Sequence, residues 1–436
     1  MLKLLKANKK FFLTNLDLIL QKRKVQNSNL ELKVKIIVND VKRNKDKALI
    51  KYEKKYSKIN NISLAKIKFS NSEKKTIINK LDKKTKKAVD LAFNRIFNFH
   101  KKQKLLSFSY KDKFNNQLSY KSNPINKVGV YVPGGLASYP SSVLMNCIPA
   151  LVAGSKEIYI ATPAMDNSYN PAVIYAAQKC KVKEIYKIGG AQAIAAMAYG
   201  TQSIKKVDKI VGPGNIYVAL AKKIVFGDVG IDMIAGPSEV TVVADKFSNP
   251  EWIAADLIAQ AEHDENSQSI LLSDNIATIK KVNFYLAEQL KNLPKKNIAF
   301  KSLKNYGLAI LVSNKKILVN IINLIAPEHL EIFLKKSNNI LNKIENAGSI
   351  FLGKYSPEAV GDYLAGPNHV LPTSGSARFS SGLSVYDFLK RRSLIKMSKS
   401  GFKKLSLSVI NLAKYENLEG HANSIKIRLK KKRKNN

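Results

Sequence analysis

The feature that most constrains the fold of this chain is a regular alternation of β-branched runs and helical stretches between residues 128 and 226. The expected strands are Val128–Val132, Glu157–Ala161, Glu184–Ile188 and Lys209–Val211. The expected helices are Ser142–Val152, Pro171–Lys179, Ala191–Tyr199 and Asn215–Phe226. Strands that alternate with helices of this length indicate βαβ units, in which crossover helices cover both faces of a parallel sheet.

A second alternation begins at the strand Glu239–Ala244, which precedes an apolar helix ending near His263. It continues through strands at Gln268–Leu272, Leu308–Val312 and Ser349–Leu352. The two alternations predict an α/β fold with two incomplete Rossmann-like domains, parallel sheets and helical terminal segments. The expected segments are an N-terminal helical segment (1–29), a first α/β domain (30–127 with 238–383), a second α/β domain (128–237), a helical segment (384–412) and a C-terminal tail (413–436).

Composition limits the classes of partner. The net charge is +42, but only eight of the 74 basic residues are arginine, the residue preferred for bidentate contacts to bases and phosphates. We therefore expect no specific nucleic-acid partner. No apolar run reaches the roughly 18 residues of a membrane span, and residues 1–24 are expected to form an amphipathic helix rather than a signal peptide. Cys147 and Cys180 lie in apolar helical settings, which is typical of buried, reduced thiols in a cytoplasmic protein.

Three glycine-containing stretches follow expected strands and precede expected helices: Gly129–Gly135, Gly189–Gln192 and Gly212–Asn215. Open α/β sheets bind ligands at such turns, because glycine lets backbone N–H groups approach a phosphate. None of the three is a G-x-G-x-x-G fingerprint or a phosphate-binding lysine loop, and a tight turn alone also favours glycine. Three such turns at one edge of a sheet favour a nucleotide or a similar ligand.

Four of the five histidines lie in short polar stretches, a pattern that points to metal binding and proton transfer. Gln260 and His263 are three residues apart at the end of an apolar helix and share a face. Asp362 is expected in a loop after a buried strand, and His421 lies in the C-terminal tail. Together these four side chains could form a mixed nitrogen and oxygen site for a divalent metal. Taken alone, Gln260 and His263 also fit a helix C-terminal cap.

Glu328 and His329 follow Pro327, and this order is typical of the first turn of a helix. That role accounts for the proline and the glutamate but leaves the histidine unexplained. Adjacent Glu and His at a helix start could act as a proton-transfer pair, with the helix dipole lowering the imidazole pKa. His369 is expected to anchor the loop 361–378 through hydrogen bonds, and His100 to be a surface or packing residue.

Many motifs in a fixed order resemble the L-histidinol dehydrogenase family over residues 30 to 428. They are Gly129–Gly135, Pro140–Asn146, Gly189–Ala195, Val207–Asn215, Ile231–Met233, 235–239, Gln260–His263, Ala326–His329 and Gly361–Arg378. The resemblance implies a zinc-dependent cytoplasmic homodimer that oxidises L-histidinol to L-histidine with two NAD, by way of L-histidinal. It also implies that 128–237 forms the NAD side, that 30–127 with 238–383 forms the substrate and zinc side, and that the tail reaches the partner's site.

The resemblance assigns roles position by position. It implies that Gln260, His263, Asp362 and His421 are zinc ligands that also contact the substrate. It implies that His329 is the base for the hydroxyl proton and that Glu328 activates water for the second oxidation. It implies NAD contacts at Tyr131, Gln192 and Asn215, and substrate contacts at Ser238, His329, His369 and Glu416.

The chain departs from the family pattern at a few positions. Ile234 stands where the family usually has proline, and Asn417–Gly420 replaces a Gly-Leu-x-Ala pattern before His421, although the spacing from Glu416 to His421 is kept. Two other classes remain open on the residues alone. A zinc-dependent hydrolase on an α/β scaffold would use Glu328 and His329 to activate water, and a polyanion-binding module would use the basic surface.

Overall fold

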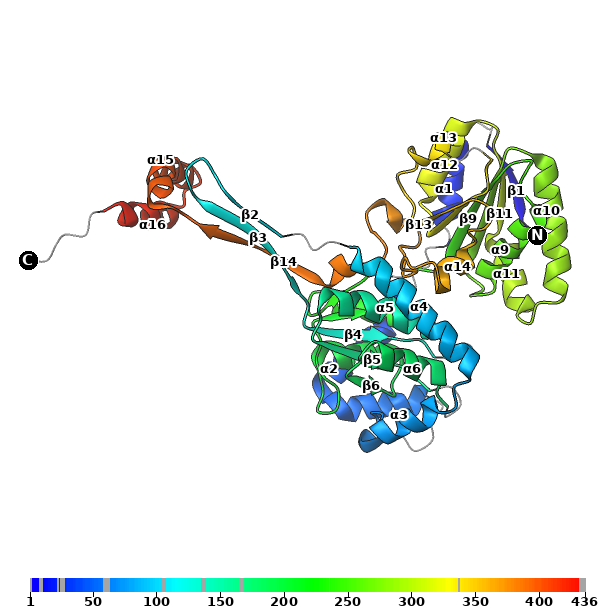
Figure 1. Cartoon of the computed structure of the whole chain (residues 1–436), viewed down its shortest axis with the longest axis horizontal. Helices are drawn as coiled ribbons and strands as arrows, with labels where there is room; N and C mark the ends of the chain where they lie inside the picture. The colour runs from blue at the N-terminus through cyan, green and yellow to red at the C-terminus, as the bar shows by residue number, and fades with distance from the viewer. Residues whose placement is uncertain are drawn as a thin grey trace, which may run out of the picture. The chain divides into compact units, whose positions relative to one another are not determined.

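The computed structural model describes residues 2–7, 11–21, 23, 28–57, 63–103, 107–134, 139–164, 168–234, 236–335 and 338–430. The chain forms two compact units: residues 1–103 with 125–388 make unit 1, and residues 104–124 with 389–436 make unit 2. Both units are drawn in Figure 1. Within the described ranges, no helix combines the length and the apolar character that crossing a membrane requires.

Unit 1 contains a six-stranded parallel sheet in the order β1-β11-β10-β9-β12-β13. Its strands are β1 (Lys3–Lys6), β9 (Glu239–Ala244), β10 (Gln268–Ser273), β11 (Leu308–Leu311), β12 (His329–Ile332) and β13 (Ser349–Leu352). Its helices are α1 (Phe12–Gln21), α9 (Pro250–Ala261), α10 (Ile276–Lys291), α11 (Lys296–Tyr306), α12 (Lys315–Ile325), α13 (Asn338–Leu341) and α14 (Glu358–Tyr363). Alternate residues of β9 point to opposite faces, so Val242 packs with α9, α10 and α11, whereas Val243 packs with α1 and α12. Both faces are covered, as the near-continuous apolar strands predict.

A second parallel sheet of unit 1 has five strands in the order β6-β5-β4-β7-β8. Its strands are β4 (Lys127–Tyr131), β5 (Glu157–Ala161), β6 (Glu184–Tyr186), β7 (Lys209–Val211) and β8 (Gly230–Ile231). The helices around it are α2 (Ser28–Tyr56), α3 (Asn71–Ile78), α4 (Lys83–Lys101), α5 (Pro140–Ala153), α6 (Pro171–Lys179), α7 (Gly190–Tyr199) and α8 (Ile216–Val225). Helix α2 packs on α7 and α8, and α4 packs on α5 and α6.

The predicted fold class is confirmed. Each strand predicted from the two alternations is present, with its ends within two residues of the prediction, and so are the four predicted helices of residues 142–226. Local sequence signals explain where helices begin in both alternations. Asn170 and Asn249 each cap a helix whose first residue is proline, so the side-chain oxygen accepts an early helical N–H and the proline needs no hydrogen-bond acceptor.

Unit 2 is a three-stranded antiparallel sheet in the order β14-β3-β2 with two helices. Its elements are β2 (Phe108–Lys111), β3 (Gln117–Pro124), β14 (Leu389–Lys396), α15 (Lys399–Tyr415) and α16 (Glu419–Leu429). The start of α15 is fixed to the β2–β3 turn, because the Ser398 N–H donates to Asn116 Oδ1 (2.9 Å) and the Ser398 hydroxyl donates to the Phe114 carbonyl (2.8 Å). Helices α15 and α16 pack on each other (Figure 1).

Three of the predicted segments differ from the structure. The segment 384–412 was predicted to be helical, but residues 389–396 form β14, because they pair with β3 along eight residues. The N-terminal segment includes β1, which pairs with β11. Helix α2 was predicted to belong with residues 238–383, but its apolar side joins the core around the five-stranded sheet. Each difference comes from a partner distant in sequence, which local patterning does not reveal.

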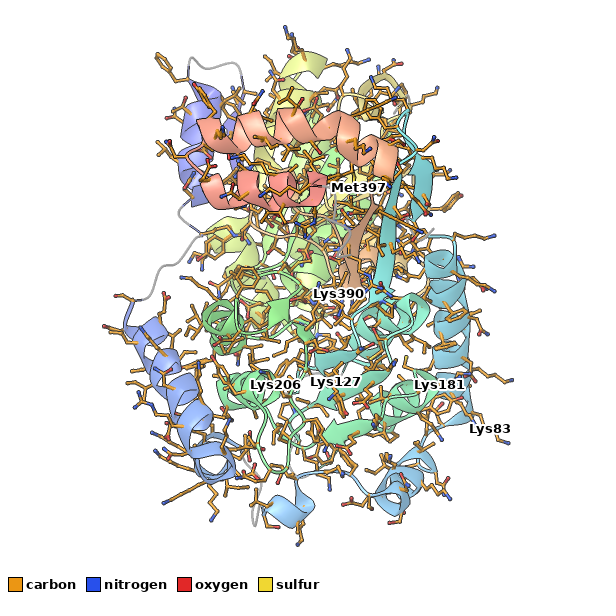
Figure 2. All side chains as sticks on the ribbon, turned by 90° about the vertical axis from the view of Figure 1, so that its left-hand side faces the viewer. Lys83, Lys127, Lys181, Lys206, Lys390 and Met397 are labelled. Carbon is orange, nitrogen blue, oxygen red and sulfur yellow. The ribbon has the colours of Figure 1, made fainter. Side chains whose placement is uncertain are left out.

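Exposed lysines come from several different parts of unit 1. Lys83 and Lys127 are the first residues of α4 and β4, Lys181 and Lys206 lie in the connections before β6 and β7, and all four are exposed (Figure 2). Cys147 and Cys180 are free and buried, as predicted. Burial, together with a hydrogen bond to Cys180, raises the pKa of the Cys147 thiol, so it remains a neutral packing group.

Candidate active site

The predicted cofactor residues and the predicted catalytic residues lie at opposite ends of their strands. Tyr131 is the last residue of β4, and Gly189 and Gly212 follow β6 and β7, so the predicted cofactor residues lie at the carboxyl ends of parallel strands. His329 is instead the first residue of β12, and Ser238 immediately precedes β9. The predicted catalytic pair therefore lies at the amino end of its strand.

Glu328 and His329 are held by the backbone of β9. The N–H of Glu239 donates to Glu328 Oε2 (2.9 Å), and the carbonyl of Glu239 lies 3.2 Å from His329 Nδ1. A carbonyl only accepts, so Nδ1 carries the proton and Nε2 carries the lone pair. His329 Nε2 is buried and has no hydrogen-bond partner among the described residues. The ring is thus fixed in the tautomer that a general base requires.

The prediction that this pair begins a helix is wrong. His329 pairs with Val240 of β9 and Ser349 of β13, and these strand contacts override the local helix-start signal of Pro327 and Glu328. The pKa of His329 falls to about 4, and the main cause is burial of the imidazole rather than a helix dipole. Burial also raises the pKa of Glu328 well above its ordinary value.

Three of the four predicted metal ligands come together in unit 1. Ligand atoms of His263, Asp362 and Glu358 lie within 4.8 Å of one another. The carboxamide of Gln260, in the orientation that satisfies its neighbours, donates from Nε2 to the two carboxylate oxygens of Glu358 (2.9 and 3.2 Å). This orientation turns Gln260 Oε1 away from the Glu358 carboxylate. The group offers imidazole nitrogen and carboxylate and amide oxygens, which suits zinc or another divalent metal.

Asp362 lies on α14 rather than in the predicted loop. Burial opposes ionisation of its carboxyl group, but the hydrogen bond and charge of His369, whose Nδ1 lies 3.5 Å from Asp362 Oδ1, outweigh burial and lower its pKa. His369 therefore contacts a predicted ligand in addition to anchoring its loop. His421 and Glu416 belong to unit 2, where both side chains are exposed. Their participation in the site stays a prediction.

Glu358 is a site residue that the sequence reasoning missed. It is the first residue of α14, one helical turn before Asp362, so both carboxylates lie on one face of the helix. Burial raises its pKa well above the ordinary value, and the carboxylates of Asp362 and Glu328 raise it further. The four-residue spacing from Asp362 is the sequence signal that could have identified it.

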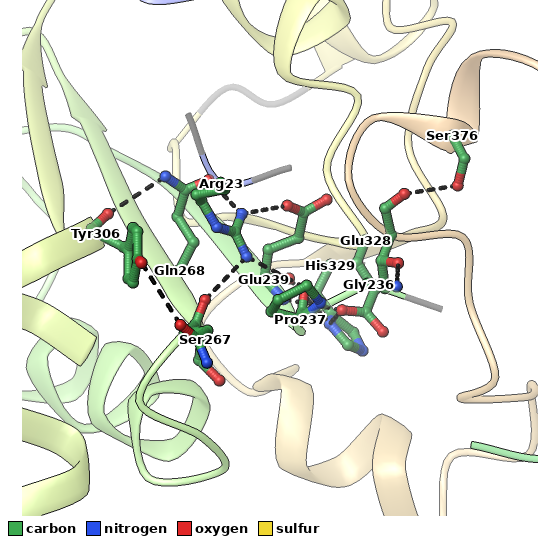
Figure 3. A network of polar contacts seen from close by, with 12 residues as sticks. Arg23, Gly236, Pro237, Glu239, Ser267, Gln268, Tyr306, Glu328, His329 and Ser376 are labelled. Carbon is green, nitrogen blue, oxygen red and sulfur yellow. Dashed lines mark hydrogen bonds and ion pairs between the residues drawn. The ribbon is translucent and has the colours of Figure 1, made fainter. Parts of the chain in front are cut away.

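Behind the catalytic pair lies a buried polar network (Figure 3). Arg23 Nη1 donates to Glu239 Oε2 (2.8 Å) and to Gln268 Oε1 (2.7 Å), and Nη2 donates to the carbonyls of Pro237 and Asn266 (3.2 Å each). The Arg23 and Glu239 side chains are only 6% and 5% exposed. Because the backbone of Glu239 holds Glu328 and His329, Arg23 supports this predicted catalytic pair from outside the site.

The three predicted cofactor residues are ordered by contacts within unit 1. Tyr131 accepts a hydrogen bond at its hydroxyl from the Gly190 N–H (3.1 Å), and Gln192 Nε2 donates to Glu53 Oε1 (2.9 Å). Asn215 Oδ1 caps α8 by accepting the N–H groups of residues 217 and 218 (3.1 and 3.2 Å). The sequence reasoning did not identify Glu53, and Gly135 of the first glycine stretch lies outside the described residues.

Comparison with known proteins identifies the family of this chain. The family model described as histidinol dehydrogenase matches residues 20–429. The chain is 55% identical to histidinol dehydrogenase of Pelagibacter ubique over 433 residues, which cover 99% of this chain and 100% of that protein. It is 48% identical to histidinol dehydrogenase of Acinetobacter baylyi, with 90% and 91% covered. The crystal structure of histidinol dehydrogenase from Elizabethkingia anophelis is similar with a TM-score of 0.92 and 38% identity over 98% of each chain. The chain therefore belongs to the histidinol dehydrogenase family.

Proposed function

We propose that this chain is a catalytic histidinol dehydrogenase that oxidises L-histidinol to L-histidine in histidine biosynthesis, with NAD as oxidant. The observation that carries the proposal is the buried His329 with its unpartnered Nε2 beside Glu328 and the ligand group of Gln260, His263 and Asp362. Family membership supports the same reaction. The balanced conversion takes histidinol, water and two NAD⁺ to histidine, two NADH and three protons.

The roles of the two catalytic residues follow from their protonation states. With a pKa of about 4, His329 is neutral at physiological pH and has a free lone pair on Nε2, so it takes the proton of the substrate hydroxyl as hydride leaves the carbon. The raised pKa of Glu328 brings that carboxyl closer to neutral pH. It is suited to take a proton from the water that adds to the aldehyde before the second hydride transfer.

The residues proposed to bind zinc and those proposed to bind the substrate overlap. Gln260, His263 and Asp362, completed by His421 of a second copy, would hold the metal, which when bound supplies a grip on the substrate's imidazole and amino groups. Glu358 orients the Gln260 carboxamide by binding its Nε2. Ser238, His369 and Glu416 complete the substrate contacts, and Tyr131, Gln192 and Asn215 contact NAD.

We further propose that two chains form a homodimer in the cytoplasm. Unit 2 supports this assembly, because α15 buries only Gly401, Ser406 and Ala413, and α16 buries only Ala422. Large apolar side chains on these helices are exposed, among them Leu407 (69%), Leu412 (64%), Tyr415 (89%) and Ile427 (64%). An exposed apolar surface of this kind marks an interface, and the same helices carry Glu416 and His421.

The test is the stoichiometry of NADH formation. Zinc-loaded protein is mixed with limiting L-histidinol and excess NAD, and both NADH and histidine are quantified. Two NADH per histidine is the expected result, since the alcohol loses four electrons. Absence of NADH from metal-replete, dimeric protein would refute the proposed activity, and one NADH per substrate with histidinal accumulating would refute the role given to Glu328.

A further inference from the structure

Glu53 is a buried carboxylate that the proposed reaction does not use, and it lies behind the proposed cofactor residues. It belongs to α2, whose apolar side packs on α7 and α8, and its residue is only 1% exposed. Its Oε1 accepts the N–H of Gly189 (3.0 Å) and the Nε2 of Gln192 (2.9 Å). One carboxylate oxygen therefore binds both the residue before α7 and the side chain proposed to contact NAD.

The contacts of Glu53 decide how Gln192 is oriented. An ionised carboxylate only accepts hydrogen bonds, so the nitrogen end of the Gln192 carboxamide must face Glu53. The oxygen end then lies above Gly190, where an added Cβ would be 2.9 Å from Gln192 Oε1. The φ of Gly190 is +64°, so this approach of side chain to backbone depends on glycine. The carboxamide is thus held with its nitrogen toward Glu53 and its acceptor oxygen toward Gly190.

The same carboxylate fixes the backbone of the turn before α7. The Gly189 N–H is bound by Glu53, and the Gly190 N–H is bound by the hydroxyl of Tyr131. Two consecutive amides of a glycine turn are therefore satisfied by side chains from α2 and β4. A glycine turn has high conformational freedom. The two acceptors restrict the backbone of this turn beside the proposed cofactor residues Tyr131 and Gln192.

We propose that Glu53 is a positioning residue of the cofactor site: it orients the Gln192 carboxamide and fixes the Gly189–Gly190 turn without touching the dinucleotide. The inference rests on the proposed contacts of NAD with Tyr131 and Gln192. Burial raises the pKa of Glu53 to about 7, which shows that keeping a carboxyl group there has a cost in stability.

The test compares two substitutions of similar size. Glu53→Gln keeps an acceptor oxygen, whereas Glu53→Met fills the space without one. NADH binding is measured by fluorescence titration, and KM is measured separately for NAD and for histidinol. We expect Glu53→Met to raise the Kd for NADH and the KM for NAD by about fivefold to tenfold, the size of a lost hydrogen bond. Glu53→Gln should stay within about twofold of wild type, and the KM for histidinol should not change in either variant.

Asp46→Leu is the matched control, because Asp46 is a buried carboxylate on the same helix that accepts the Ser203 N–H (3.0 Å) and hydroxyl (2.9 Å) away from the cofactor residues. It should lower stability without changing the Kd. A double-mutant cycle with Gln192→Ala then tests whether Glu53 acts through Gln192. Adding Glu53→Met to Gln192→Ala should weaken NADH binding by less than twofold.

The outcomes separate this inference from the proposed function. Wild type that fails to bind NADH, or Gln192→Ala that binds it normally, would refute the cofactor assignment on which the inference rests. If Gln192→Ala weakens binding but Glu53→Met does not, Glu53 has no positioning role. Equal losses in Asp46→Leu and Glu53→Met would also overturn the inference, because general destabilisation would then explain both.

Discussion

Replacing Arg23 by methionine would leave a carboxylate buried without its cation. Arg23 is the only cation that the structure pairs with Glu239 within the described residues, and it is also bound to Gln268 and to the carbonyls of Pro237 and Asn266. Burial already raises the pKa of Glu239, and the charge of Arg23 partly offsets that effect. Methionine has a similar length but no charge, so the pKa of Glu239 should rise further in the variant.

The size of the effect follows from the cost of protonating Glu239. At pH 7.5, protonating a carboxyl group that has the ordinary pKa of 4.5 costs about 4 kcal/mol, at about 1.4 kcal/mol for each pH unit above the pKa. Wild type already bears part of this cost, so the variant should lose about 3 kcal/mol of unfolding free energy at pH 7.5, as expected for breaking a buried ion pair. A carboxyl whose pKa is raised by folding loses stability as pH increases above its ordinary pKa. The deficit should therefore shrink to about 1 kcal/mol at pH 5.

The assay is urea unfolding followed by the fluorescence of Trp252, the single tryptophan of the chain, which lies on α9 beside the same sheet. Wild type and Arg23→Met are compared at pH 5 and pH 7.5, together with Arg23→Met/Glu239→Gln. The double variant lacks the unpaired carboxylate, so it should recover most of the loss at pH 7.5. A deficit below 1 kcal/mol, or one that does not change with pH, would refute the reasoning.

Four further substitutions test the candidate site and the cofactor side. His263→Ala and Asp362→Ala should each lose bound zinc and most activity, and full zinc occupancy after gel filtration, measured by atomic absorption, would reject the ligand assignment. Glu328→Gln should spare the first hydride transfer but slow overall turnover, so in a single turnover the first NADH should form from histidinol at the normal rate, whereas NADH should form slowly from histidinal; equal slowing through weaker binding would indicate a positioning role. Glu53 has a pKa of about 7 against an ordinary 4.5, so wild type should lose about 3 kcal/mol of stability as pH rises from 4.5 to 7, and Glu53→Gln should remove this dependence. Parallel stability curves for the two proteins would contradict that pKa.

The sequence predicts the parallel sheets well because their signals are local. Every residue of β9 and β10 is buried. In the sequence, both strands appear as short runs with apolar residues at their centre, bounded by turns. Strand β14 has the sequence LKRRSLIK, with four charged residues, and its partner β3 is more than 260 residues away in the chain. Nothing local distinguishes it from a charged helix. The start of β12 was also misassigned, because proline followed by glutamate satisfies the preferences of a helix start while the strand pairing is set elsewhere.

The candidate site divides in the same way. Gln260, His263, Glu328, His329 and Asp362 stand in short polar motifs and were identified from the sequence. Arg23 and Glu53 were not, because each is followed by lysine in a charged segment where an ionised side chain normally faces water. Their burial depends on contacts 216 and 136 residues away in the chain, which only the folded structure provides.

Two glycine turns lie beside the proposed cofactor residues and are fully described by the structure. Buried charged side chains bind the backbone of both turns. At Gly212 the N–H donates to Asp232 Oδ2 (2.8 Å) and the carbonyl accepts from Lys222 Nζ (3.1 Å), while Lys222 and Asp232 also form an ion pair. The φ of Gly212 is +113°, and an added Cβ would lie 2.1 Å from the Tyr131 carbonyl oxygen, so no other residue fits. A position restricted to glycine has the most conformational freedom to lose, and only contacts from outside the turn can fix it. Asp232 and Lys222 do this for Gly212 as Glu53 does for Gly189. The rigidity of the proposed cofactor site is therefore encoded in residues outside the glycine motifs themselves.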